Sequence, residues 1–107
     1  MKELVNQEQY EDMWFGRSTG RPFLIWFTAK WCRPCQLMDK EALISAATAK
    51  GIDFYYCDQT RNKYTAGYCD IRAFPTFMLL KPGAVVASLT NSNTDTVCHW
   101  IRNLPLK

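Results

Sequence analysis

The feature of the sequence that most constrains its fold is a C-x-x-C pair, formed by Cys32 and Cys35. An apolar run at residues 23–27 precedes the pair, and a segment of helical character at residues 36–50 follows it. The run is long enough for one central strand that is covered on both faces of a sheet. A strand followed by C-x-x-C and a helix is the setting in which two cysteines indicate a redox site rather than a metal site.

The expected helix places both sulfur atoms at its amino end. If Cys32 is the N-cap residue and Arg33 is the first helical residue, the Cys32 sulfur lies among backbone N–H groups that favour a thiolate. Pro34 suits an early helical position because its fixed φ helps initiation and its missing N–H is not needed there. Cys35 follows one turn later on the same face, within reach of a disulfide. We therefore predict that Cys32 is the exposed nucleophile and Cys35 the more buried resolving thiol.

Residues 31–35, with the sequence W-C-R-P-C, resemble the active-site motif of the thioredoxin family. Trp31 and Pro34 match that motif, whereas Arg33 stands where the family usually has glycine. Residues 71–76 resemble the cis-proline loop of the same family, and the resemblance covers nearly the whole chain. It implies the thioredoxin fold, an α/β fold with a central mixed β-sheet of roughly four to five strands and helices on both faces. The length predicts a single domain, residues 1–107.

The resemblance also implies a cis peptide bond between Phe74 and Pro75 that lies against the Cys32 sulfur. A cis bond is readily accessible only before proline, and the residue before proline favours an extended conformation. Ala73, Phe74 and Pro75 are therefore the predicted substrate-binding residues, where the backbone of residue 74 pairs with a client peptide as an added strand. The alternative is a plain proline at the start of a strand.

Trp26 stands at a position where family members often carry a buried aspartate, which is thought to relay a proton for the resolving cysteine. An indole N–H only donates, so Trp26 cannot accept that proton. We expect Trp26 to fill core volume and Cys35 to lose its proton to water or to the leaving thiolate, which predicts slow resolution. Family members also kink the helix with a proline where this chain has Lys40, so we expect a straighter helix.

These features predict an enzyme, a protein thiol–disulfide oxidoreductase that reduces or exchanges disulfides of client proteins through Cys32 and Cys35. The sequence contains no nucleotide- or flavin-binding motif, so we expect no cofactor and a partner reductase or a low-molecular-weight dithiol as electron donor. The charge of Arg33 predicts a low pKa for Cys32 and a couple that is less reducing than is usual in the family. Two alternatives are a more oxidising disulfide exchanger or isomerase and a non-catalytic module that binds clients.

Three further cysteines lie outside the motif. Cys57 and Cys98 are predicted to be small core residues, and Cys69 is expected to be the most exposed of the three. A Cys57–Cys69 disulfide is an alternative pairing. One close pair lacks the second pair of a zinc ribbon, so no metal site is predicted, although a cluster shared between two chains through the motif is an open alternative.

The composition limits the functional classes further. The chain is 48% hydrophobic, enough for a core without structural disulfides, and its five cysteines do not form a secreted disulfide framework. A net charge of +3 gives no case for nucleic-acid binding. We find neither a membrane-spanning stretch nor a secretory signal. The expectation is an intracellular monomer, cytoplasmic or mitochondrial, and an import segment ahead of the chain stays open.

Overall fold

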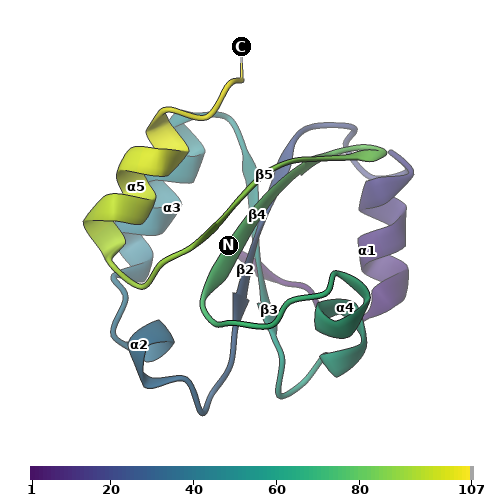
Figure 1. The fold of residues 1–107 in the computed structure, drawn as a ribbon. Helices are drawn as coiled ribbons and strands as arrows, with labels where there is room; N and C mark the ends of the chain where they lie inside the picture. The colour runs from purple at the N-terminus through teal and green to yellow at the C-terminus, as the bar shows by residue number, and fades with distance from the viewer. Residues whose placement is uncertain (107) are drawn as a thin grey trace.

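The computed structural model describes residues 1–106 and contains a five-stranded sheet with helices on both faces (Figure 1). The strands lie in the spatial order β1-β3-β2-β4-β5. Strands β1, β3 and β2 are parallel, whereas β4 is antiparallel to both β2 and β5. The strands are β1 (Lys2–Glu3), β2 (Phe23–Thr28), β3 (Asp53–Asp58), β4 (Thr76–Lys81) and β5 (Ala84–Thr90). The predicted mixed sheet is confirmed.

Helices α3 and α5 cover one face of this sheet, and helices α1 and α4 cover the other (Figure 1). Over residues 1–106, no helix has the length and apolar character that a membrane crossing requires. The helices are α1 (Gln7–Trp14), α2 (Arg33–Gln36), α3 (Lys40–Ala49), α4 (Lys63–Tyr68) and α5 (Thr94–Arg102).

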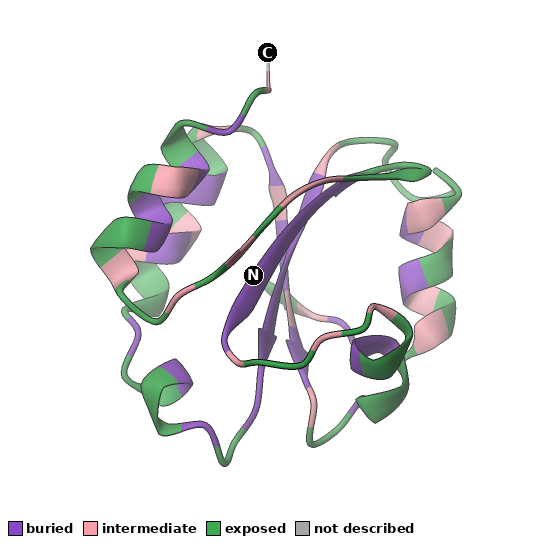
Figure 2. Cartoon of the chain, in the orientation of Figure 1, coloured by how far each residue is buried: buried purple, intermediate pink, exposed green. Residues whose placement is uncertain are grey.

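Strand β2 lies at the centre of the sheet and is buried along its whole length (Figure 2). Its side chains alternate between two cores because successive residues of a strand point to opposite faces. Leu24 and Trp26 belong to the core under α3 and α5, whereas Phe23, Ile25 and Phe27 belong to the core under α1 and α4. The continuous apolar run thus forms a strand covered on both faces, as predicted.

The helix predicted for residues 36–50 is interrupted after one turn, and α3 begins separately. Asp39 is the N-cap residue of α3, and its carboxylate accepts a hydrogen bond from the Ala42 N–H at 3.2 Å. The Asp39 N–H donates to the Thr94 hydroxyl at 3.0 Å. The prediction of a straighter helix from Lys40 is therefore wrong, because α2 ends with Leu37 as its C-cap and Asp39 then starts α3 as a new helix, without a proline.

Candidate active site

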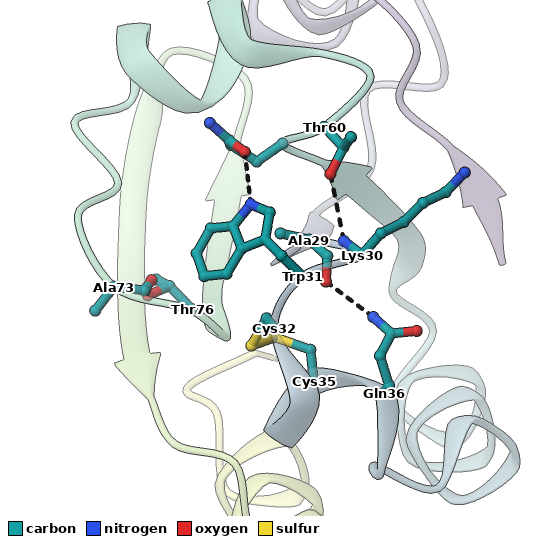
Figure 3. Close-up of a disulfide and its surroundings, with 10 residues drawn as sticks. Ala29, Lys30, Trp31, Cys32, Cys35, Gln36, Thr60, Ala73 and Thr76 are labelled. Atoms are coloured by element: carbon teal, nitrogen blue, oxygen red, sulfur yellow. Dashed lines mark hydrogen bonds between the residues drawn. A yellow bond between two sulfur atoms is a disulfide. The ribbon is translucent and has the colours of Figure 1, made fainter.

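Cys32 and Cys35 form a disulfide at the amino end of α2 (Figure 3). Their Cα atoms are 5.4 Å apart, an ordinary separation for such a bond. Cys32 is the N-cap residue of α2 and Pro34 lies in its first turn, as predicted. In this disulfide form Cys32 is only 5% exposed and Cys35 is 0% exposed. The prediction that Cys32 is exposed is wrong for this disulfide form, because Ala29 and Phe74 pack around the disulfide. Cys35 is the more buried of the two, as predicted.

Hydrogen bonds fix the turn that joins β2 to α2. The Ala29 carbonyl accepts from the Cys32 N–H at 3.0 Å and from the Gln36 side-chain amide at 2.9 Å (Figure 3). The Lys30 N–H donates to the Thr60 hydroxyl at 3.3 Å. Gln36 thus helps to position the cysteine pair, a role that its place after the motif did not reveal.

The second segment of the site comes from the loop before β4. The peptide bond between Phe74 and Pro75 is cis, which confirms the expectation from the resemblance. Phe74 is half-buried against the disulfide, Pro75 is buried and Ala73 is exposed. The Thr76 hydroxyl donates to the Ala73 carbonyl at 2.7 Å and so holds the loop at its exit. The structure therefore brings the predicted substrate-binding segment next to the cysteine pair.

Trp31 connects the two segments from the solvent side. Its side chain is 65% exposed, and its ring meets the Phe74 ring edge-on at a centroid distance of 5.4 Å. The indole N–H donates to the Gln59 side-chain carbonyl at 3.2 Å (Figure 3). Leu37, just after α2, is 71% exposed, and this exposure was not predicted from the sequence. Exposed aromatic and aliphatic side chains of this kind are a usual feature of surfaces that bind peptides.

The charge near the disulfide is positive. Arg33 and Lys30 are exposed, and neither forms an ion pair among the residues that the structure describes. Because α2 is a single turn, the N–H groups of that turn and the Arg33 charge act on Cys32, rather than a long helix dipole.

Replacing Arg33 by glycine is expected to raise the pKa of Cys32 in the reduced protein. The guanidinium is solvated, so the rise should be less than about one unit and should shrink with added salt. Titration of the thiolate absorbance in Arg33→Gly measures the change, and Arg33→Lys, which keeps the charge, is the matched control. A titration that is identical in both variants and in the parent protein contradicts the role assigned to Arg33.

Trp26 lies in the core under α3 and α5 and lines one cavity together with Cys35. It is 2% exposed, and its ring stacks between Phe54 and Phe77 at centroid distances of 6.5 Å and 5.7 Å. Within the described part of the chain, its indole N–H has no hydrogen-bond partner. The prediction that Trp26 fills core volume is confirmed by this packing.

The remaining cysteines are free thiols in the structure. Cys57 and Cys98 are buried and Cys69 is half-buried, as predicted, and the alternative Cys57–Cys69 disulfide is not formed. Burial raises the pKa of Cys57 to about 12, and it also raises the pKa values of Cys69 and Cys98. These side chains therefore stay protonated and unreactive near neutral pH. Across residues 1–106, no group of three or more histidine, cysteine or acidic side chains is placed to hold a metal ion.

The fold, the disulfide and the cis-proline loop agree with one known family. A sequence model of the thioredoxin family matches residues 3–103. The chain belongs to the thioredoxin family. Thioredoxins are thiol–disulfide oxidoreductases, and the C-x-x-C disulfide assigns the same activity to this protein.

Individual thioredoxins show how far the similarity extends. Thioredoxin H-type from Fagopyrum esculentum is 28% identical over 95 residues, which cover 89% of this chain and 82% of that protein. The crystal structure of oxidised mitochondrial thioredoxin 3 from Saccharomyces cerevisiae is 26% identical, with a TM-score of 0.81 and coverage of 97% and 95%. Fasciola hepatica thioredoxin, at 24% identity, has the same fold, with a TM-score of 0.82 and coverage of 97% and 99%.

Proposed function

We propose that the protein reduces disulfides of client proteins with Cys32 as the nucleophile and Cys35 as the resolving thiol. The unequal surroundings of the two sulfurs carry this assignment. Cys32 is the N-cap residue of α2 and lies beside Phe74, whereas Cys35 is fully buried behind it. A sulfur at a helix start is favoured as a thiolate, and a buried thiol one turn away is held ready for the second step.

The reaction proceeds by two exchanges. The Cys32 thiolate attacks one client sulfur, the client S–S bond breaks, and the other client sulfur leaves as a thiolate that takes up a proton. Cys35 then loses its proton and attacks the Cys32 sulfur, which breaks the mixed disulfide and releases the first client sulfur. The client gains two electrons, and the enzyme is left with the Cys32–Cys35 disulfide. A partner reductase or a low-molecular-weight dithiol returns the electrons.

The client docks on the loop that carries the cis bond. Ala73 is exposed and Phe74 is half-buried, and an extended client segment adds as a strand along the backbone of this loop. Trp31 and Leu37 supply exposed apolar surface on either side of the cysteine pair. Pro75 is buried and sets the direction of the loop.

The protein acts as a monomer and as one domain, residues 1–107, in the cytoplasm or in mitochondria. Its three free thiols suit a reducing compartment, since a compartment that oxidises thiols favours disulfide frameworks. The yeast relative whose name places it in mitochondria supports the second location.

Covalent trapping tests this proposal. Cys35→Ser is expected to accumulate a mixed disulfide between Cys32 and its client, because the second exchange has no attacking thiol. Dithiothreitol reduces such mixed disulfides and releases the client. Mass spectrometry of the adducts that it cleaves identifies both the client and the linked cysteine. The double variant Cys32→Ser with Cys35→Ser is the control and should trap nothing. Adducts on Cys69, or none at all, contradict the assignment of Cys32.

A further inference from the structure

The strand register places polar side chains beside Trp26 on the face of the sheet that α3 covers. Trp26 on β2 is opposite Tyr56 on β3, and Tyr56 is opposite Glu3 on β1. Two residues further along, Thr28 on β2 is opposite Asp58 on β3. These five side chains share one face, because side chains alternate along a strand.

A cavity of about 260 Å³ lies over this face and extends to Cys35. Both Trp26 and Asp58 line it, although they are only 2% and 6% exposed. Liquid water occupies about 30 Å³ per molecule, so the cavity has room for several waters.

The resolving step needs a proton acceptor on this side of the disulfide. Cys35 has no exposed surface, and the indole at position 26 cannot accept its proton. We propose that Asp58 accepts the Cys35 proton through water in this cavity, so that β3 supplies the carboxylate that position 26 lacks. The inference rests on the proposed function, because only a resolving cysteine has to lose its proton during turnover.

Asp58 is better placed for this role than the other acids of the cavity. The Glu3 carboxylate is held by the Arg61 guanidinium at 3.2 Å and by the Tyr56 hydroxyl at 3.4 Å. Burial raises the pKa of Tyr56, so that phenol keeps its proton near neutral pH. One oxygen of Asp58 accepts the Thr60 N–H at 2.9 Å. Asp58 forms no ion pair in the portion of the chain that the structure covers, which leaves its second oxygen for water.

Other charged groups along the cavity assist the loss of the proton. The basic side chains Lys30, Lys40 and Arg61 line it together with Glu3, Tyr56 and Asp58. The cations outnumber the carboxylates, and nearby positive charge favours the thiolate form of a cysteine.

Each bond in the step is accounted for. The S–H bond of Cys35 breaks, and its proton passes through water to the Asp58 carboxylate. The sulfur of Cys35 uses the freed electron pair to bond with the Cys32 sulfur. The bond between Cys32 and the client sulfur breaks, and the client leaves as a thiolate. Asp58 then returns its proton to solvent through the cavity.

The variant Asp58→Asn tests this route and preserves the local fold, because asparagine keeps an oxygen that accepts the Thr60 N–H. Acid quenching and mass spectrometry measure the decay of the mixed disulfide formed with a disulfide-bonded peptide. Near neutral pH the decay should slow on the order of 10-fold to 100-fold, toward the low end of proton-transfer effects. The difference from the parent protein should shrink as the pH is raised, because hydroxide can then take the Cys35 proton without Asp58. Alkylation of Cys32 by iodoacetamide should be unchanged.

Four outcomes overturn the inference. Equal slowing at every pH indicates a structural effect, and decay at the parent rate near neutral pH shows that Asp58 is not needed. Glu3→Gln is the matched control and should decay close to the parent rate. If Glu3→Gln gives the pH-dependent loss and Asp58→Asn does not, the acceptor is wrongly assigned. If the parent protein forms no mixed disulfide, both the proposed function and the inference are wrong.

Discussion

Replacing Cys32 by serine is expected to lower insulin disulfide reduction to the rate of dithiothreitol alone. The serine hydroxyl stays protonated at neutral pH, so the residue at the N-cap of α2 loses its nucleophile. Cys35 cannot substitute for it, because Cys35 is fully buried within α2. The onset of insulin precipitation, followed by turbidity with dithiothreitol as donor, measures the loss.

Cys98→Ser is the matched control for this experiment. It removes one thiol from the core under α3 and α5 and leaves the disulfide and the cis-proline loop in place. Its rate should stay near that of the parent protein. If Cys32→Ser keeps a substantial part of the activity, Cys32 is not the nucleophile. If Cys98→Ser loses as much, the loss in Cys32→Ser is not specific to the cysteine pair.

Replacing Trp26 by alanine is expected to lower the free energy of unfolding by about 3–5 kcal/mol, the usual cost of deleting a buried large aromatic side chain. Trp26 stacks on both Phe54 and Phe77, so alanine leaves a void that the neighbouring rings cannot fill. A loss of this size is a large fraction of the stability of a small domain and should lower Tm by more than about 10 °C. Urea unfolding of the reduced protein, followed by far-UV circular dichroism, measures it.

Trp31→Ala removes the same side chain from the surface and is the matched control. Because Trp31 is 65% exposed, its loss should change the free energy of unfolding by less than about 1 kcal/mol. Similar losses in the two variants would show that Trp26 is not the packing centre of the core under α3 and α5.

The sequence predicted the features that depend on neighbouring residues. The pair Cys32 and Cys35, with Pro34 between them, defines a helix start by spacing alone, and the structure has that helix start. The cis bond before Pro75 and the buried strand β2 were also predicted, because a resemblance and an unbroken apolar run point to them. In each case a local pattern carried the information.

The features that were missed depend on residues far apart in the sequence. The break before α3 uses the Asp39 cap, which is visible in the sequence, but also the contact of Asp39 with Thr94, which is not. The burial of Cys32 comes from Phe74, in a loop that folds back over the disulfide. Both contacts need the complete fold before they exist.

The cavity was beyond prediction for a similar reason. Asp58 and Cys35 share it only because β3 lies beside β2 in one register, with Asp58 opposite Thr28. A register shifted by one residue would turn the Asp58 side chain to the other face of the sheet. The sequence showed that Trp26 lacks a carboxylate, and the register shows where another one lies.

The separation of α2 from α3 has a mechanical consequence. The two sulfurs sit on one turn with its own beginning and end, joined to the core helix through Leu37, Met38 and Asp39. The S–S bond therefore opens and closes within that turn, and α3, which packs in the core, begins beyond it at its own Asp39 cap.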